Sequence, residues 1–260
     1  MIDNRLFDLT YIGGPTVILE IDGLRFMTDP TLDAQGSSFA NDHTTLEKTK
    51  GPALTEIDNI DIVLLSHDHH HDNLDYSGRE FLKTVSKTYT TVSGAQRLGD
   101  NAIGLSPWKQ DILFTTNGTQ VTITATPARH GPAGIEKLTG DVIGFLITVA
   151  GKQPFELYLT GDTVYYEGIR DVAKKANPDY VLIYAGAAQP TGPFNLTMST
   201  NDALDTSYTF PEAQIIPLHF EGWKHFTQNE QDLLDAFGVL NIQHKLNVLT
   251  LGEKTAFFPR

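Results

Sequence analysis

The chain has 260 residues, 40% hydrophobic and 20% charged, which is typical of a globular protein with a sizeable core and excludes a disordered chain. Lys and Arg number 19 against 32 Asp and Glu, and this formal net charge of −13 disfavours nucleic acid and anionic membranes as partners. The absence of cysteine excludes disulfides, thiolate metal sites and a Cys nucleophile.

The ends and connections of the chain carry no targeting or linker signal. Residues 1–5 lack a basic region followed by an apolar stretch, and no run approaches the ~20 apolar residues of a membrane helix. We therefore expect a cytoplasmic protein without a membrane partner. Because no linker or low-complexity tract divides the sequence, we expect a single domain spanning residues 1–260.

The predicted elements begin with strands. Two β-rich runs, Thr16–Ile21 and Leu24–Thr28, flank Asp22-Gly23, and this pattern predicts a tight hairpin. Residues 32–59 are polar, irregular and long for a connection, so they predict an insertion of the kind that can cover a site. The apolar run 60–65 then predicts a buried strand.

The rest of the chain mixes helices and strands. A capping box at 77–80 predicts a short helix, and a second at 227–230 predicts a helix that ends at Gly238. Apolar patterns predict further elements, which are a helix at 168–176 and strands at 121–126, 142–149, Phe155–Leu159, Tyr180–Tyr184, Gln214–Leu218, 247–251 and 255–258. Helices are too few for a β/α barrel, and two packed sheets with helices outside fit this order best.

A dense histidine run is the main chemical signal. Four of the nine histidines fall within five residues, in the segment HDHHHDN at 67–73. Imidazole and carboxylate groups are ligands for zinc and similar divalent metals. Repulsion between imidazolium groups and their burial oppose such a cluster unless a cation organises it. A solvated His-rich loop is the alternative, and a cloning scar is disfavoured because the run is internal and follows a predicted buried strand.

Four predicted strands lead to residues of the metal-ligand type. These residues are His67, His130, Asp162 and His219. Strand ends can bring together parts of a chain that are distant in sequence, and rigid scaffolds place active sites in this way. A lone His after a strand is more often a hydrogen-bonded surface residue, but the four together with the histidine run favour one metal site.

These motifs resemble the metallo-β-lactamase superfamily, whose signature is His-x-His-x-Asp-His followed by single His, Asp and His ligands. The segments 12–17, 28–30, 66–75, 126–132, 158–163 and 219–223 are similar to the branch that contains L-ascorbate-6-phosphate lactonase and uncharacterised metal-dependent hydrolases. The resemblance spans nearly the whole chain. It implies an α/β fold, the αββα sandwich of two packed sheets with outer helices, with metals at one edge between the sheets.

The resemblance also implies the chemistry of the site. It implies one or two divalent metals per chain, with zinc favoured and manganese or iron as alternatives. The ligands it assigns are His67, His70 and His130 for the first metal, Asp72 and His219 for the second, and Asp162 as the bridge. It implies hydrolysis by a metal-bound hydroxide, with Asp72 as the catalytic residue that orients the hydroxide or accepts its proton.

The spacing of the histidine run departs from the family signature. Asp72 lies five residues after His67, where the signature places Asp four residues after the first His. One register keeps His70 and Asp72 as ligands and puts Asn73 where the last His belongs, which leaves the second metal a weaker ligand. The other register keeps His67 and His69 and puts His71 and Asp72 at the Asp and His positions of the signature. The sequence favours the first, which matches uncharacterised relatives, and leaves the second open.

The favoured function is hydrolysis of a small-molecule ester, lactone or related bond. The alternatives are a phosphodiesterase of the same superfamily, a redox relative, and a non-catalytic metal-binding protein. The acidic balance argues against a nucleic-acid substrate, and the filled ligand positions argue against a protein that has lost catalysis. Association into a homo-oligomer is expected because related lactonases associate.

Two features near the predicted site have open roles. His225, six residues after His219, is expected to be a packed, hydrogen-bonded structural residue, with a substrate-facing donor as the alternative. Residues 185–200 are rich in small residues, Gly and Pro, and are expected to line the pocket, with a plain loop as the alternative.

Overall fold

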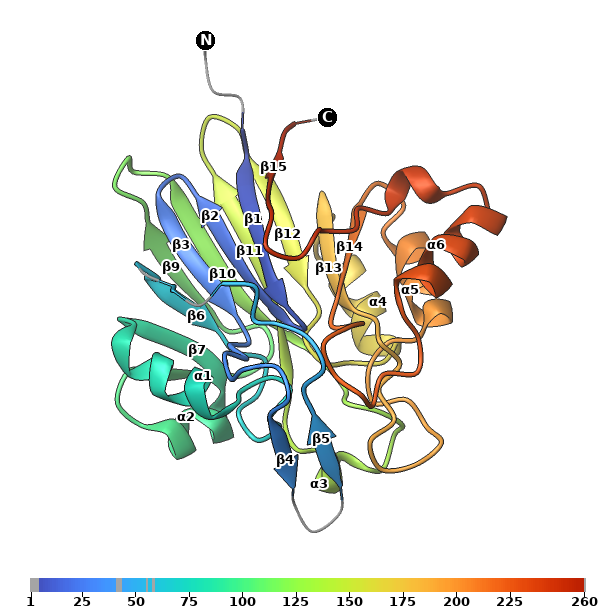
Figure 1. Ribbon diagram of the computed structural model, residues 1–260. Helices are drawn as coiled ribbons and strands as arrows, with labels where there is room; N and C mark the ends of the chain where they lie inside the picture. The colour runs from blue at the N-terminus through green and yellow to red at the C-terminus, as the bar shows by residue number, and fades with distance from the viewer. Residues whose placement is uncertain (1–4, 41–43, 55, 58, 260) are drawn as a thin grey trace.

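Two β-sheets pack face to face, and helices cover the outer surface of each sheet (Figure 1). This computed structural model describes residues 5–40, 44–54, 56–57 and 59–259. The expected αββα sandwich is confirmed. The single-domain organisation stays a prediction, and the expected lack of a leader falls largely on residues 1–4, outside the described residues.

The strands and helices have the following bounds. The first sheet has the order β15-β1-β2-β3-β6-β7-β8, with β1 (Phe7–Gly13), β2 (Thr16–Ile21), β3 (Leu24–Thr28), β6 (Ile62–Leu64), β7 (Lys87–Thr91), β8 (Ala102–Leu105) and β15 (Lys254–Phe257). The second has the order β14-β13-β12-β11-β10-β9, with β9 (Gln110–Phe114), β10 (Gln120–Pro127), β11 (Ile143–Ala150), β12 (Phe155–Leu159), β13 (Tyr180–Tyr184) and β14 (Gln214–Leu218). A separate hairpin pairs β4 (Ser38–Ala40) with β5 (Thr45–Glu47). The helices are α1 (Tyr76–Phe81), α2 (Val92–Leu98), α3 (Glu136–Thr139), α4 (Glu167–Ala173), α5 (Thr200–Thr209) and α6 (Glu230–Val239), with 3₁₀ turns at Leu82–Thr84 and Gln243–Lys245.

The strand directions send several chain segments to one edge of the sandwich. In the second sheet, β10 and β12 run in the same direction because both pair antiparallel with β11. Strands β12, β13 and β14 pair in parallel, so they share that direction. In the first sheet, β3, β6, β7 and β8 are also parallel neighbours. The carboxyl ends of these strands therefore meet at common edges, where side chains can converge.

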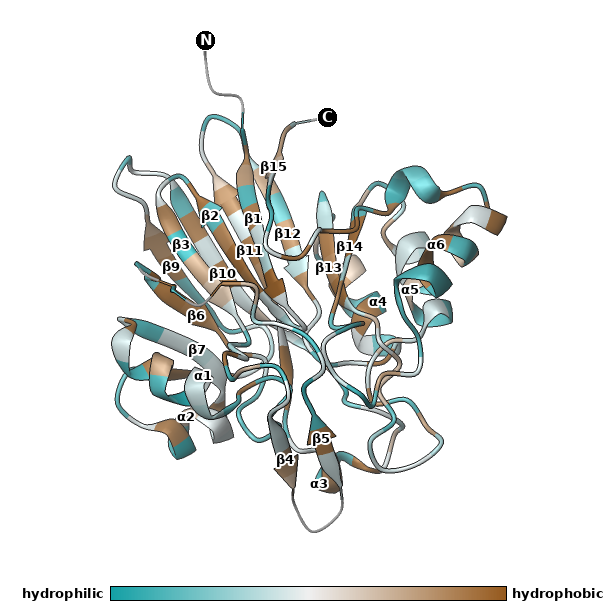
Figure 2. Ribbon diagram, in the orientation of Figure 1, coloured by the Kyte–Doolittle hydropathy of each residue, from teal (hydrophilic) through white to brown (hydrophobic). Residues whose placement is uncertain are grey.

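Apolar side chains fill three layers of the sandwich. The layer between the sheets contains Leu19 and Phe26 from the first sheet and Phe145 and Leu157 from the second. A second layer packs the outer face of the second sheet against α4, α5 and α6, and a third lies on the outer face of the first sheet. Figure 2 shows the corresponding brown bands along the strands. Each sheet is buried on both faces, which explains why β6 and β13 are apolar throughout.

The predicted hairpin and most predicted strands are confirmed. Strands β2 and β3 have the predicted bounds, and Asp22 and Gly23 adopt the positive φ angles of 47° and 84° that a two-residue hairpin turn requires. Strands β12, β13 and β14 also match residue for residue. The strand predicted at 247–251 is wrong. The isolated bridge from Ile215 to Leu246 lies just before this segment, and within it Asn247 N–H donates to the Ile215 carbonyl, so the segment lacks the repeated pairing of a strand.

Both predicted capping boxes are misplaced. The residue that caps α1 is Asp75, whose carboxylate accepts the Gly78 N–H at 2.8 Å, while the Ser77 hydroxyl donates to Asp33 instead. Helix α6 is capped by Asn229, and the Thr227 hydroxyl donates to the Ala187 carbonyl. In both cases a tertiary contact takes the side chain that the local pattern assigned to the cap.

Two helical features also differ from the prediction. Gly238 lies inside α6, which continues to Val239. Helix α5 is absent from the prediction because its buried side chains are small or polar, among them Thr200, Ala203 and Thr206, and they leave no apolar periodicity. The longest described helices have ten residues, and none in the described part of the chain could span a bilayer.

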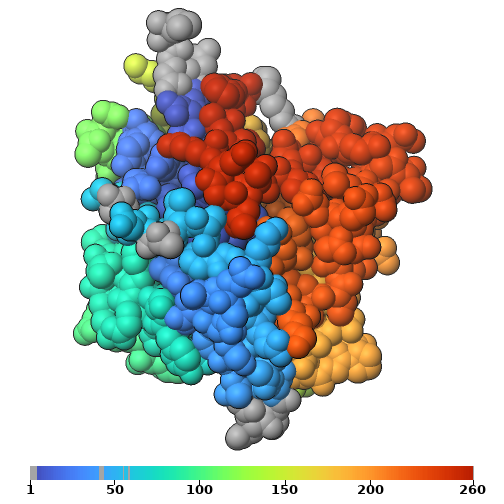
Figure 3. Space-filling view, in the orientation of Figure 1, coloured from blue at the N-terminus to red at the C-terminus, as the bar shows by residue number. Residues whose placement is uncertain are grey.

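A buried ion pair fastens the insertion at 32–59 to the sandwich. Lys48, directly after β5, places its ammonium 3.3 Å from Asp75 and 2.6 Å from the Thr31 carbonyl. The Asp75 carboxylate also accepts the backbone N–H groups of Leu32 and Asp33. Both charged side chains are buried, at 2% and 0% exposure. In Figure 3 the blue to cyan surface of this part of the chain covers the lower middle of the molecule.

This network predicts an asymmetry between its two charged members. Asp75→Ala removes a helix cap and leaves the Lys48 ammonium unpaired in the interior, so we expect a loss of about 3 kcal/mol or more in the free energy of unfolding. Lys48→Met should cost less, because Asp75 keeps its backbone donors. Urea denaturation of both variants measures this. Lys83→Met, which breaks an exposed pair with Glu80, is the control with no expected effect. Equal losses for Asp75→Ala and Lys48→Met would contradict the argument.

Candidate metal centre

The predicted ligand residues come together at the carboxyl edge of the sheets. His67, His130, Asp162 and His219 follow β6, β10, β12 and β14 within a few residues. Their ligand atoms form two groups in which all atoms lie within 4.8 Å of one another, His67 with His130 and Asp162, and Asp72 with Asp162 and His219. The structure therefore brings together these predicted residues from both sheets, and that they bind metal stays a prediction.

His70 adds a third imidazole beside the His67 and His130 rings of the first group. His70 Nδ1 lies 3.0 Å from both His67 Nε2 and His130 Nε2. Nitrogens bound tetrahedrally to one zinc lie about 3.3 Å apart, given Zn–N bonds of 2.0–2.1 Å. The far nitrogen of His130 lies 2.8 Å from the Leu196 carbonyl, which accepts its proton. This contact fixes the tautomer whose Nε2 lone pair points into the group.

The geometry separates His69 from His70. Each offers a ring nitrogen within 4.8 Å of one on His67. His69 Nε2, however, donates to the Thr139 carbonyl at 2.5 Å, and the ring packs so closely on Gly140 that a Cβ there would lie 2.4 Å from it. Within the described residues, His70 makes no such contact with a backbone carbonyl, and its Nδ1 faces the Nε2 atoms of His67 and His130. The structure favours the register through His70.

Asp162 lies between the two groups. Its Oδ2 is 3.7 Å from His130 Nε2, and its Oδ1 is 3.5 Å from His219 Nε2. Asp72 Oδ2 is 3.6 Å from the same His219 nitrogen. Gly161, at φ 63°, allows this close approach, because a Cβ there would lie 2.5 Å from the Ile143 carbonyl. Asp162 therefore has the geometry of a bridge, with one oxygen toward each group.

Unpartnered polar atoms at this edge indicate that a cation belongs there. Within the described residues, both carboxylate oxygens of Asp162 and both ring nitrogens of His219 are buried without a hydrogen bond. Each such atom costs about 1–3 kcal/mol unless something satisfies it. Burial, together with the charges of Asp72 and Asp29, raises the pKa of Asp162 well above its usual value. Divalent cations would satisfy both Asp162 oxygens and His219 Nε2, the ring nitrogen that faces Asp72 and Asp162, and would offset this repulsion, so the residues fit a metal site.

The imidazoles are in the form that binds metal. Burial lowers the pKa of His130 to about 4 and lowers those of His67, His70 and His219 below the usual value. These rings are therefore neutral at pH 7, which leaves a nitrogen lone pair on each one. Asn73, which the favoured register puts in place of a His, is buried beside them. Its Nδ2 donates to Ser66 Oγ at 3.5 Å, and its Oδ1 has no partner among the described residues.

His225 supports Asp72 from outside the ligand groups. Its Nε2 lies 2.9 Å from Asp72 Oδ2, and its side chain is only 7% exposed. Burial opposes the charge on Asp72, but His219 and His225 outweigh it and hold the pKa of this carboxyl well below its usual value. Asp72 is therefore ionised, and His225 has the packed, hydrogen-bonded position expected from the sequence.

Asp29 is a member of the site that sequence reasoning did not identify. It accepts the Ser66 N–H at 2.6 Å and the Tyr184 hydroxyl at 2.5 Å. It thereby joins the segment before His67 to the end of β13 in the other sheet. Burial raises the pKa of Asp29 to about 7. Its position between the strand Leu24–Thr28 and Pro30 was the available signal, because it too is an acidic residue at a strand end.

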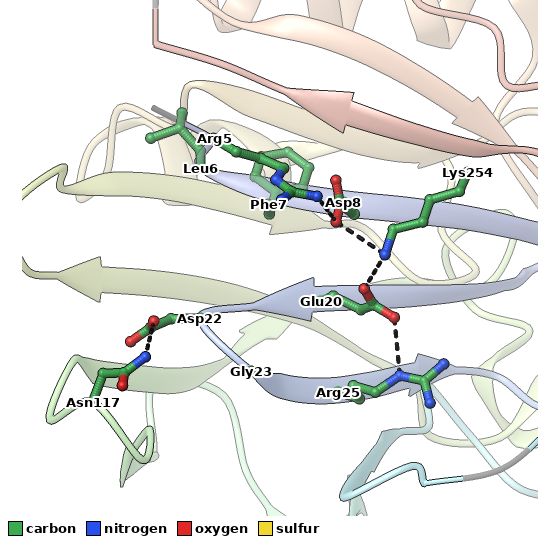
Figure 4. A pocket seen from close by; sticks show the side chains of 10 residues that line it. All are labelled: Arg5, Leu6, Phe7, Asp8, Glu20, Asp22, Gly23, Arg25, Asn117 and Lys254. Carbon is green, nitrogen blue, oxygen red and sulfur yellow. Dashed lines mark hydrogen bonds and ion pairs between the residues drawn. The ribbon is translucent and has the colours of Figure 1, made fainter. Parts of the chain in front are cut away.

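A hollow elsewhere on the molecule has no such chemistry. It encloses about 570 Å³ beside β1, β2 and β3, and its charged side chains pair with one another, apart from Asp22, which accepts from Asn117 (Figure 4). Asp8 pairs with Arg5 at 2.8 Å and with Lys254 at 3.1 Å, and Arg25 pairs with Glu20 at 3.0 Å. Because these charges neutralise each other, this hollow offers little to a charged ligand.

The chain belongs to the beta-lactamase superfamily, whose domain model matches residues 24–220. It is a metal-dependent hydrolase of this superfamily. A UPF0173 metal-dependent hydrolase of Carboxydothermus hydrogenoformans is 27% identical over 94% of this chain and 97% of that protein. The N-acyl-phosphatidylethanolamine-hydrolyzing phospholipase D 1 of Caenorhabditis elegans is 26% identical over 70% of this chain and 54% of its own length. The crystal structure of an isothiocyanate hydrolase from Delia radicum gut bacteria has a similar fold, with a TM-score of 0.79, 23% identity and coverage of 97% of this chain and 100% of that one.

The register of the histidine run can be tested by metal content. His70→Ala removes the nitrogen that faces two other imidazoles, so we expect the purified variant to retain less than about a tenth of the wild-type metal at the first site. His69→Ala should retain most of it, because His69 is engaged by Thr139. Inductively coupled plasma mass spectrometry measures both variants. The reverse result would establish the register through His67 and His69.

The bridging position of Asp162 gives a second prediction. Asp162→Asn keeps the shape but removes a negative charge between two cation positions, so the cations would repel each other more. We expect the second position, at Asp72 and His219, to lose metal first, and hydrolysis to fall with that loss. The metal-free variant should melt no lower than the metal-free wild type, because the raised pKa of Asp162 means that its carboxylate is unfavourable in this buried position without metal. Two ions retained at wild-type affinity would show that Asp162 is not the bridge, and unfolding would show a structural role.

Proposed function

We propose that this metal-dependent hydrolase cleaves an ester or lactone bond of a small molecule. The observation that supports this proposal is the pair of ligand groups that share Asp162, beside an ionised Asp72. A bound divalent metal lowers the pKa of water to about 7 and so supplies hydroxide at neutral pH. Such a nucleophile suits an ester or lactone carbonyl.

The residues of the chain have separate tasks in this mechanism. His67, His70 and His130 would hold a first metal and Asp72 and His219 a second, with Asp162 as the ligand shared by both. Asp72 Oδ2, held by the His225 N–H, accepts a proton or orients the attacking water. Because His225 fixes this carboxylate, Asp72 keeps one orientation during attack.

The donor atoms of the two groups suit different metals. The first group offers three imidazole nitrogens and a carboxylate oxygen, a set that zinc prefers. The second offers two carboxylates and one imidazole, and such oxygen-rich sets also suit Mn²⁺ or Fe²⁺. We propose zinc at the first position and zinc, manganese or iron at the second.

A phosphodiesterase is the second candidate, because one relative is a phospholipase D that hydrolyses N-acyl-phosphatidylethanolamine. Two metals can clamp the oxygens of a phosphoryl group, so the chemistry is available. The net charge of −13 favours an uncharged substrate over an anionic one. The same charge supports a protein without nucleic-acid or membrane partners, which we propose to be cytoplasmic and able to form a homo-oligomer.

A substrate panel tests the proposed function. We expect zinc- or manganese-loaded protein to hydrolyse phenyl acetate or γ-butyrolactone, and EDTA to abolish this activity until metal is restored. Hydrolysis of bis(p-nitrophenyl) phosphate should be at least about tenfold slower. His130→Ala should lower kcat/KM by about a hundredfold or more, since it removes a metal ligand. Cleavage of the phosphodiester without either carbonyl substrate would establish the second candidate. Allyl isothiocyanate belongs in the panel because a hydrolase of similar fold acts on isothiocyanates.

A further inference from the structure

We infer that the site accepts a short, uncharged, apolar group as the substrate portion next to the scissile bond, and excludes anionic and long-chain substrates. This inference rests on the proposed function and adds the class of substrate to it. It follows from the cavity beside the metal ligands, which opens next to His70, Asp72 and His130.

The cavity wall is largely apolar. Besides His69, His70, His71, Asp72 and His130, the described residues that line it come from the β4–β5 hairpin, α3 and the 185–200 segment. The sequence predicted a lining role for the 185–200 segment. The residues from the three segments are Phe39, Thr44, Leu46, Leu138, Thr139, Ala188, Pro190, Thr191 and Leu196. Six of these nine are apolar and three are threonines. Such a wall favours an apolar substrate group, because its burial costs no unpaired polar contact.

No Lys or Arg lies among the described residues that line this cavity. Three cations on neighbouring elements are engaged elsewhere, and Lys137 on α3 is exposed and does not line the cavity. Lys48 pairs with Asp75, Lys224 pairs with Glu47, and the Arg129 guanidinium lies 4.6 Å from the centre of the Tyr166 ring. An anionic group in this cavity would therefore find no Lys or Arg partner on the wall, and only the metal ions would offset the cost of its lost hydration.

The volume of the cavity limits the size of the group. The described residues enclose about 100 Å³. A cavity of about 150 Å³ holds one benzene molecule, whereas sites for drug-sized ligands have about 300–1,000 Å³. A phospholipid acyl chain, or an aromatic group larger than one ring, would extend beyond this space.

The walls are held in place by contacts outside the cavity. The Thr44 hydroxyl donates to the Pro190 carbonyl at 3.0 Å, which joins the hairpin to the 185–200 segment. The Phe39 ring stacks on His71 at 4.8 Å between centroids, beside Trp223. Because the hairpin is also fastened through Lys48, the cavity does not widen freely to take a larger group.

Leu138 is the residue that tests this inference. It lines the cavity from α3, and its side chain is 53% exposed, so its substitution should leave the fold intact. Leu138→Ala enlarges the cavity, and Leu138→Lys brings a cation to it. Val239, 81% exposed at the end of α6, provides the matched controls Val239→Ala and Val239→Lys.

The experiment compares kcat/KM for p-nitrophenyl butyrate, p-nitrophenyl octanoate and the anionic mono-p-nitrophenyl succinate. We expect the metal-loaded wild type to favour the butyrate by about tenfold or more over each of the others. In Leu138→Ala, the ratio of kcat/KM for the butyrate to that for the octanoate should fall by about threefold or more. In Leu138→Lys, the ratio of kcat/KM for the butyrate to that for the succinate should fall by about threefold or more. The Val239 variants should match the wild type.

The outcomes separate this inference from the proposed function. If the wild type hydrolyses all three esters equally well, or the succinate best, the inference is wrong and the proposed function stands. If the Leu138 and Val239 variants respond alike, the cavity does not select the substrate and the inference is again wrong. If the metal-loaded protein hydrolyses none of these esters and none of the carbonyl substrates tested above, the proposed function fails, and the inference fails with it.

Discussion

The burial of Asp162 is the constraint on which the rest of the site depends. Its carboxylate is fully buried near the carboxylates of Asp72 and Asp29, and neither oxygen has a hydrogen bond within the described residues. Proteins avoid an isolated buried charge because its desolvation exceeds any packing gain. The arrangement becomes favourable when cations lie between the carboxylates and the surrounding imidazoles. Metal binding is therefore coupled to the stability of this edge of the sandwich.

The fold holds these buried carboxylates and imidazoles close together, although their proximity is unfavourable without a cation. Strands from both sheets end at the same edge, and Asp29 ties the two sheets there through Ser66 and Tyr184. His219 adopts φ 53°, in the left-handed region that non-glycine residues occupy at a cost of order 1–3 kcal/mol. Buried packing on both faces of each sheet stabilises the fold enough to retain this strain. The strained residue is also a predicted ligand, as is common at functional sites.

Sequence reasoning succeeded where a signal was local or repeated. The hairpin at Asp22-Gly23 follows from the backbone angles that these residues favour, and the buried strands follow from uninterrupted apolar runs. It failed at the helix caps, because Ser77 and Thr227 have partners that are distant in sequence. It did not predict helix α5, because the buried residues of this helix are small or polar and give no apolar repeat at helical spacing. The register of the histidine run stayed open because adjacent histidines are chemically identical. Their tertiary contacts distinguish them, since His69 meets Thr139 and Gly140 and His70 faces His130.

The sequence by itself determined the class of chemistry and the residues that could carry it. A dense histidine run and acidic or histidine residues at strand ends have few explanations other than a metal site, since each type is costly to bury alone. The tertiary structure decided how these groups combine. It put the two oxygens of Asp162 toward different groups, set His225 against Asp72, and enclosed a small cavity between three segments that are far apart in the chain. Distances and volumes of this kind depend on how strands and loops pack across the sandwich, and no local pattern in the sequence encodes that packing.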